Sequence, residues 1–224
     1  MDARDSSKQS RPVAGQRRRS RTREALLAAG RILFAQRDVD AVSIDEIVNL
    51  AEVAKGSFYN HFADKEAFAR EIGAEVRNRI EDQIIKATAG VQDPALHVAL
   101  GMCVFAHFAH TSRDGARVLY KLNDGSTMIE APINRRICDV VRRGLDAGRF
   151  RDLDLQFGVL LVMGQTVITV RHMLEERRVT PPPEVARTMA QTMLRALGVP
   201  LAEARRLSTR AARQVFAEAD SPAA

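Results

Sequence analysis

The apolar positions of this chain recur at the spacing of an α-helix along most of its length. Sustained alternation of apolar and polar residues, the mark of a strand, is absent from the sequence. Pro94, Pro132 and Pro200 fall where helices begin, and Gly148 and Gly198 fall where helices end. The pattern predicts an all-α protein, with helices near residues 22–36, 43–50, 54–61, 64–89, 94–112, 115–122, 131–147, 154–177, 183–197 and 200–217.

The lengths of the predicted helices divide the chain. Three short helices come before residue 62 and longer ones follow. We therefore expect a disordered arm over residues 1–20, a compact three-helix unit over residues 21–66, and a larger helical domain over residues 67–224.

The composition is that of a globular protein, with 46% hydrophobic and 28% charged residues. The longest uninterrupted apolar run, Gly158 to Gly164, is far shorter than the roughly 20 residues that span a bilayer. The basic N-terminus lacks the apolar stretch of a secretory signal, and Cys103 and Cys138 are too few for a disulfide framework. These features predict a cytoplasmic protein without a membrane segment.

The positive charge of the chain is concentrated at its N-terminus. The whole chain carries a net charge of +6, and residues 1–23 hold eight basic and two acidic side chains. The rest of the chain is therefore balanced. A basic arm before a folded domain is typical of proteins that bind nucleic acid, and Arg17, Arg18 and Arg19 lie nearest the first helix. The alternative is a tail that only improves solubility.

Residues 43–61 have the pattern of two short helices joined by a tight turn. Ser43 and Glu46 have the spacing of a capping box, which starts a helix. The apolar residues behind the cap fall on one helical face, and a break at residues 52–53 precedes a second short helix. Together with the preceding helix, this is the layout of a helix-turn-helix unit.

The second short helix carries polar side chains around a narrow apolar stripe, and its expected length suits a DNA major groove. Lys55 and Asn60 are able to reach base edges, and Gly56 lets the backbone approach the DNA. The hydroxyl and imidazole side chains suit phosphate oxygens, and they belong to Ser57, Tyr59 and His61. The alternative is an ordinary solvated helix.

Several segments closely resemble the tetracycline-repressor (TetR) family of transcription regulators. They are Thr22 to Glu24, Leu33-Phe34, Ser43, Ile47, the run from Val53 to Phe62, and Asp64 to Glu66. The resemblance covers about residues 20–70. It implies a DNA-binding unit, a helical domain that binds a small molecule, and a dimer formed by long C-terminal helices. It also implies DNA contacts from Ser43 and Lys65, in addition to the residues of the second short helix.

The resemblance has two local departures. Asp38 and Glu52 stand where the family usually has glycine. A left-handed backbone at either position costs about 1 kcal/mol or more. Residues 24–70 also carry five basic and eight acidic side chains, so attraction to DNA must come largely from the arm.

The helix predicted over residues 94–112 is apolar on most sides, which is typical of a central buried helix. Cys103, His107 and His110 share one face of it, and they favour either a pocket wall, a soft metal site or simple packing. The absence of acidic side chains on this helix predicts a mainly apolar effector. The candidate pocket residues are Met102, Cys103, Phe105, His107, Phe108, His110, Tyr120, Met128, Phe157, Met163 and Gln165.

The predicted helices at 154–177 and 183–197 carry more apolar positions than one buried face requires. Packing within the chain is one explanation. The family resemblance favours the other, a homodimer interface formed by these two helices.

Signatures of nucleotide-binding loops, zinc proteases and paired metal-binding cysteines are absent from the sequence. We therefore expect no enzyme activity, no cofactor and no bound metal. The sequence predicts a ligand-responsive regulator, most simply a repressor, that binds a palindromic operator in double-stranded DNA as a homodimer. The alternatives are an architectural DNA-binding protein without an effector and a helical enzyme with a vestigial DNA-binding motif.

Overall fold

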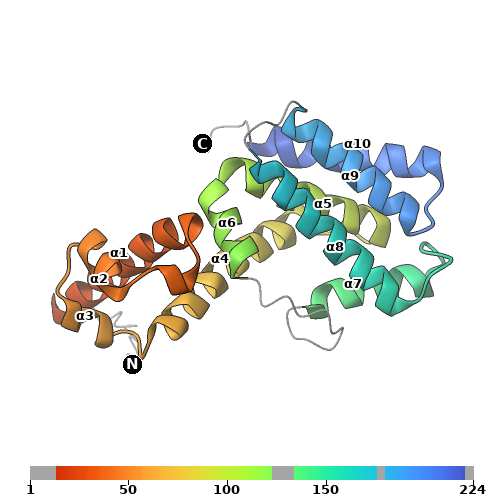
Figure 1. Ribbon diagram of the computed structural model, residues 1–224. Coiled ribbons are helices and arrows are strands. Elements are labelled where there is room, and N and C mark those ends of the chain that lie inside the picture. The colour runs from red at the N-terminus through yellow and green to blue at the C-terminus, as the bar shows by residue number, and fades with distance from the viewer. Residues whose placement is uncertain (1–13, 123–133, 176–179, 220–224) are drawn as a thin grey trace, which may run out of the picture. The chain divides into compact units, whose positions relative to one another are not determined.

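The computed structural model describes residues 14–122, 134–175 and 180–219. Every regular element in these residues is helical, as the sequence predicts (Figure 1). The elements are α1 (Ala14–Gln36), the 3₁₀ helix η1 (Val39–Ala41), α2 (Ile44–Leu50), α3 (Lys55–Tyr59), α4 (Lys65–Ala87), α5 (Pro94–Thr111), α6 (Arg113–Lys121), α7 (Arg135–Asp146), α8 (Leu155–Leu174), α9 (Pro182–Ala196) and α10 (Leu201–Ala219).

The chain divides into two compact units between Ala69 and Arg70, within α4. The N-terminal unit packs α1, α2 and α3 around an aromatic cluster. The Phe58 ring lies 5.5 Å from that of Phe62 and 5.2 Å from that of Phe68, between ring centroids. Phe34 of α1 joins the cluster with its ring 5.8 Å from Phe68. Edge-to-face contacts of this kind stabilise a small core beyond the area that they bury.

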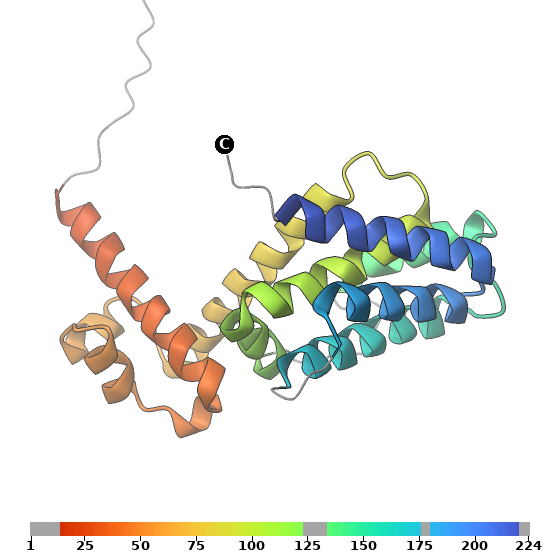
Figure 2. The same cartoon turned by 90° about the horizontal axis from the view of Figure 1, so that it is seen from above.

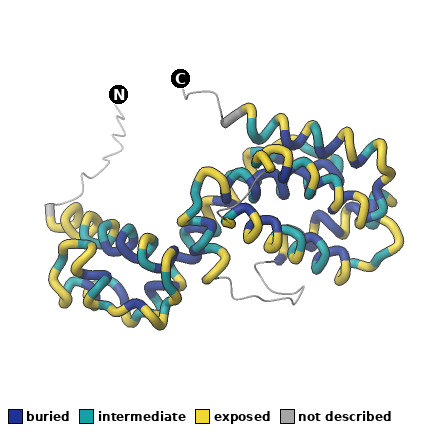
Figure 3. The backbone as a smooth tube through the Cα atoms, turned by 45° about the horizontal axis from the view of Figure 1, so that its top comes forward, coloured by how far each residue is buried: buried dark blue, intermediate teal, exposed yellow. Residues whose placement is uncertain are grey.

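The C-terminal unit is a helical bundle with α5 at its centre. This helix packs against α8, α9 and α10, and more lightly against α6 and α7 (Figure 2). Most α5 side chains are buried in one large apolar core that α7, α8, α9 and α10 also supply (Figure 3). A helix apolar on most sides is expected at such a position.

Glycine residues end two helices of this bundle, and one arginine joins three of its segments. Gly148 and Gly198 have φ angles of 62° and 85°, as expected for residues after helix ends. A side chain on Gly198 would come within 2.9 Å of the Arg151 backbone, so this turn requires glycine. Arg149 bonds both Asp93 before α5 and Glu203 in α10, at 3.0 and 2.9 Å, which links three parts of the bundle.

Several helix boundaries differ from the prediction, and two of the differences affect the N-terminal unit. Residues 14–20 were expected in a disordered arm, but α1 begins at Ala14 and includes them. Arginine, glutamine and alanine favour helix, and a high charge does not prevent a helix that is continued by a packed segment. The helix α3 covers only Lys55–Tyr59, because the chain turns after Asn60 and brings Phe62 into the aromatic cluster.

Among the described residues, one helix, α8, is long and apolar enough to cross a membrane by its length and composition. Its longest uninterrupted apolar run is short, so the run length alone did not indicate it. Core helices of bundles meet the same criterion. A third of the apolar window of α8 is buried within the described protein, so much of this helix faces outward in one copy of the chain.

Candidate nucleic-acid interface and ligand-binding region

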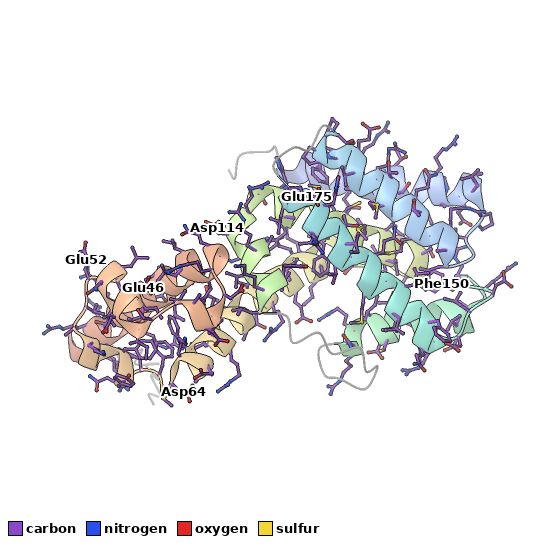
Figure 4. The ribbon with its side chains drawn as sticks, viewed as in Figure 1. Glu46, Glu52, Asp64, Asp114, Phe150 and Glu175 are labelled. Atoms are coloured by element: carbon purple, nitrogen blue, oxygen red, sulfur yellow. The ribbon has the colours of Figure 1, made fainter. Side chains whose placement is uncertain are left out.

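The start of α2 is fixed by the predicted capping box. The Glu46 backbone N–H donates to the Ser43 hydroxyl at 3.2 Å, and the Ser43 backbone N–H donates to the Glu46 carboxylate at 2.9 Å. Arg37 forms an ion pair with the same carboxylate at 2.7 Å. The bond from the Ser43 backbone and the bond from Arg37 lower the pKa of Glu46 to about 2. The cap that orients α2 (Figure 4) is therefore ionised at any physiological pH.

The turn between α2 and α3 is tight and places one residue in a left-handed conformation. Glu52 has a φ angle of 54°, and the next N–H, that of Val53, donates to the Val48 carbonyl at 3.0 Å. Asp38, the other departure from the family pattern, has an ordinary φ angle of −70°. Only Glu52 therefore carries the backbone strain that the sequence analysis considered for both positions.

The short helix α3 buries Phe58 and turns its polar side chains outward. Lys55, Gly56, Tyr59 and Asn60 are exposed, whereas Ser57 and His61 are half-buried. Tyr59 keeps 54% of its surface exposed, although its ring packs edge-on against that of Phe58 with 5.5 Å between centroids. In the described part of the chain, no neighbouring heavy atom lies within 4 Å of the position that a side chain on Gly56 would occupy, so this backbone is open to close approach.

Two lysines of the predicted interface have partners within the N-terminal unit. The Lys55 ammonium lies 2.8 Å from the Asp45 carboxylate, and this hydrogen-bonded pair raises the pKa of Lys55. The Lys65 ammonium donates to the Val42 carbonyl at 3.0 Å and more weakly to that of Asp40 at 3.4 Å. Lys65 thus anchors the segment before α2, a role that the sequence did not reveal.

The N-terminal extension of α1 forms a cationic cleft with α3. This open cleft of about 470 Å³ is lined by Gly15, Arg18, Arg19, Thr22, Ser57, Asn60 and His61. The Arg19 guanidinium donates to the Asn60 carbonyl at 3.4 Å. Partial burial, and then the charges of Arg19 and Arg23, lower the pKa of His61, which favours its neutral form. Two of the three predicted arm arginines therefore lie beside the second short helix, and Arg17 is exposed nearby on α1.

The predicted pocket residues do not share one face. Met102, Cys103 and Phe108 are buried in the bundle, but His110 and Phe157 are exposed. The six candidates on α5 point in different directions around the helix, and which of them line a pocket stays a prediction. Of the others, Phe105, His107, Met163 and Gln165 are half-buried, Tyr120 is exposed, and Met128 lies outside the described residues.

Individual contacts explain several of these positions. The His107 ring packs edge-on against Phe216 of α10, with 5.1 Å between centroids. Gln165 donates from its side-chain amide to the Met189 carbonyl at 2.8 Å, which joins α8 to α9. Burial raises the pKa of Cys103 to about 12, so its thiol stays protonated. Within the described residues, no group of three His, Cys, Asp or Glu side chains is placed to hold a metal ion.

The sequence analysis missed His97 on α5. Both ring nitrogens are buried, and neither has a hydrogen-bond partner in the described part of the chain. A buried polar group without a partner is costly and is rare in native proteins. The available signal was a single polar residue within the apolar first half of this helix.

The apolar residues predicted for the dimer surface differ in exposure between α8 and α9. On α8, Phe157, Val167 and Ile168 are exposed by 62%, 37% and 57%. On α9, Val185 is buried and Met193 belongs to the large apolar core of the same chain. These two α9 residues therefore serve packing within the bundle, and an interface formed by α8 and α9 together stays a prediction.

Comparison with known proteins places this helical architecture in the class of bacterial DNA-binding regulators. The protein-family model described as "Bacterial regulatory proteins, tetR family" matches residues 26–72 of the sequence. The model described as "Tetracyclin repressor-like, C-terminal domain" matches residues 93–210. The chain belongs to the TetR family. This membership places it among transcription regulators rather than enzymes.

Relatives by sequence match the N-terminal unit. The chain is 51% identical over 47 residues to the transcriptional repressor NemR of Escherichia coli K12, a segment that covers 21% of this chain and 24% of NemR. It is 41% identical over 54 residues to the repressor DhaR of a Mycobacterium strain, which covers 24% of this chain and 27% of DhaR. The chain thus matches about a quarter of the length of these relatives.

Solved structures extend the likeness to most of the chain. The structure of RolR in complex with resorcinol has a TM-score of 0.63 and 25% identity, and covers 87% of this chain and 96% of RolR. A tetR-family regulatory protein from Rhodococcus RHA1 has a TM-score of 0.67 and 21% identity, and covers 80% of this chain and 98% of the other. The second match concerns the fold alone.

Proposed function

We propose that this protein is a ligand-responsive transcription repressor that binds a palindromic operator in the cytoplasm as a homodimer and is released by a small, mainly apolar effector. The observation that carries the proposal is the exposed face of α3, which presents Lys55, Tyr59 and Asn60 beside Arg18 and Arg19. This arrangement occurs in a chain of the TetR family, and the repressors NemR and DhaR are similar to it over the same unit.

In this proposal, α3 enters the major groove of the operator. Lys55 and Asn60 contact base edges, and the open backbone at Gly56 allows the close approach that this requires. Ser57, Tyr59 and His61 contact phosphate oxygens and fix the register, with Ser43 and Lys65 as further phosphate contacts.

The ion pair between Lys55 and Asp45 is exchanged in the complex. Both side chains are more than half exposed, so breaking the pair in water costs little. DNA then replaces one carboxylate with several phosphates. Asp45 thus competes with the DNA phosphates for the Lys55 ammonium.

The cationic cleft supplies charge that α3 lacks. Arg18 and Arg19 line it, and further arginines of α1 flank them on both sides. Arginines beside a recognition helix neutralise flanking phosphates or enter the adjacent minor groove. This offsets the excess of acidic side chains in the rest of the N-terminal unit.

The homodimer forms through the outward face of α8, with the predicted contribution of α9 reduced to its exposed edge. Phe157 and Ile168 project from α8, and the space beside Gly164 is open. A second copy covers this apolar stripe, which would otherwise stay in water. Two copies related by a two-fold axis place their recognition helices in successive major grooves, about 34–36 Å apart.

The effector binds in the C-terminal unit and favours a conformation with a different spacing of the recognition helices. The RolR structure was solved with resorcinol, and the likeness to RolR at 25% identity supports a compact aromatic effector here.

The test begins with the selection of bound sequences from random duplex DNA. The proposal expects a palindrome, and binding without sequence preference would instead identify an architectural protein. Lys55→Ala and Tyr59→Ala should each abolish tight binding to the selected operator while leaving the helical circular-dichroism spectrum unchanged. Lys86→Ala is the matched control, because Lys86 is an exposed lysine on α4 outside this surface. Retention of tight binding by the Lys55 and Tyr59 variants would refute the assignment.

A further inference from the structure

One face of α5 is incompletely packed. Most residues of this helix are buried in the bundle core, but His97, Gly101 and Phe105 are only half-buried. They are spaced four residues apart and therefore lie along one side of the helix. The structure leaves this stripe of α5 only partly covered by the described residues.

The stripe contains an unsatisfied polar group. The two ring nitrogens of His97 are buried, and they have no hydrogen-bond partner in the described residues. A neutral imidazole has one N–H donor and one nitrogen acceptor, so both functions are vacant. A hydroxyl group can supply either missing partner, since it both donates and accepts.

The stripe also contains open space. Among the described residues outside the helix's own backbone, no heavy atom lies within 4 Å of the position that a side chain on Gly101 would occupy. A glycine inside a helix lowers stability relative to alanine, and none of these described neighbours requires one here. Gly101 therefore leaves room one turn from the imidazole, with the apolar Phe105 ring one turn beyond.

The charges around His97 come from α7. Burial lowers the pKa of His97, and the nearby guanidiniums of Arg143 and then Arg136 lower it further. The imidazole is therefore neutral near pH 7. The same cations disfavour a positively charged ligand.

We propose that the stripe formed by His97, Gly101 and Phe105 is the subsite that anchors the effector, and that the effector is a compact aromatic compound carrying a hydroxyl group. The ring occupies the space beside Gly101, and its hydroxyl hydrogen-bonds the His97 imidazole. This inference rests on the proposed function, in which the C-terminal unit binds an effector.

The test measures binding of three aromatic probes of similar size to the full-length protein by calorimetry, without DNA. Phenol should bind about tenfold more tightly than toluene, the effect of one buried hydrogen bond. Benzylamine, which is cationic, should bind more weakly than phenol because Arg143 and Arg136 lie near His97. Equal binding of phenol and toluene, or tighter binding of benzylamine, would overturn the proposal.

Variants assign the effect to this stripe. His97→Phe should weaken phenol binding about tenfold and remove its advantage over toluene, while the melting temperature stays equal or rises because an unsatisfied polar group is gone. His97→Gln, which restores a donor and an acceptor, should recover part of the affinity. Gly101→Leu should block both probes by filling the space. His110→Phe is the matched control, because His110 is exposed at the other end of α5.

Two results would refute the subsite: phenol affinity unchanged in both His97→Phe and Gly101→Leu, or an equal loss in His110→Phe. Operator release is measured separately by fluorescence anisotropy. If phenol binds through His97 but leaves the operator bound, the subsite stands and the effector role fails. If no operator is found, the proposed function fails while the calorimetric result keeps its meaning.

Discussion

Replacement of Glu52 by glycine should stabilise the protein. Glu52 lies in the turn between α2 and α3 with a φ angle of 54°, a conformation that L-residues with a side chain adopt at a cost of roughly 1–2 kcal/mol. Its side chain is exposed. Glycine removes the steric cost, but it is more flexible in the unfolded chain, which takes back about 0.5–1 kcal/mol. The net gain in the free energy of unfolding is about 0.5–1 kcal/mol.

The gain should be visible in thermal melting. For a chain of this size, 1 kcal/mol shifts the melting temperature by about 2–4 °C, so Glu52→Gly should melt about 1–4 °C higher than the original protein. Hydrogen exchange gives the location, because the slowed amides should cluster in α2 and α3 and not in the bundle.

Two further variants test the cause. Glu52→Ala removes the same charge but keeps a side chain, so it should gain little. Asp38→Gly makes the same kind of change where the backbone is not left-handed (φ −70°), so it should lower the melting temperature. If Glu52→Gly melts no higher than Glu52→Ala, or if Asp38→Gly gains as much, backbone strain at Glu52 is not the reason.

Three other predictions concern the cap, a turn and the DNA-facing ion pair. The pKa of Glu46 falls from 4.5 in the unfolded chain to about 2 in the folded protein. The stabilisation by its carboxylate is therefore complete above pH 4.5 and is lost as the pH falls toward 2. In acid denaturation, the Glu46→Gln variant should lose less stability over this interval than the original protein. Gly198→Ala should lower the melting temperature by several degrees, because its side chain would meet the Arg151 backbone at 2.9 Å and its φ angle is 85°; an unchanged melting curve would contradict the close contact. Asp45→Asn frees Lys55 and removes a negative charge near the DNA. Operator affinity should therefore rise several-fold at low salt, and this gain should shrink at high salt. A lower affinity would mean instead that the ion pair positions Lys55 for binding.

The sequence determined the features that depend on residues close together in the chain. Ser43 and Glu46 form the predicted cap because a capping box needs only residues three apart. Gly148 and Gly198 end their helices because glycine alone takes a positive φ angle without strain. The segment from Val53 to Phe62 carried the family resemblance for the same reason, since its geometry is set within one turn and one short helix.

Only the tertiary structure decided features that depend on what a residue meets. Apolar spacing looks the same whether a face packs within the chain or lies outward, so Met193 of α9 and Ile168 of α8 were indistinguishable in sequence although one is buried and the other exposed. Asp38 and Glu52 both stand at turns, and the path of the surrounding chain gave only Glu52 a left-handed backbone. His97 became informative because the packing of α5 buried its imidazole and provided no partner for it, which depends on neighbours distant in sequence.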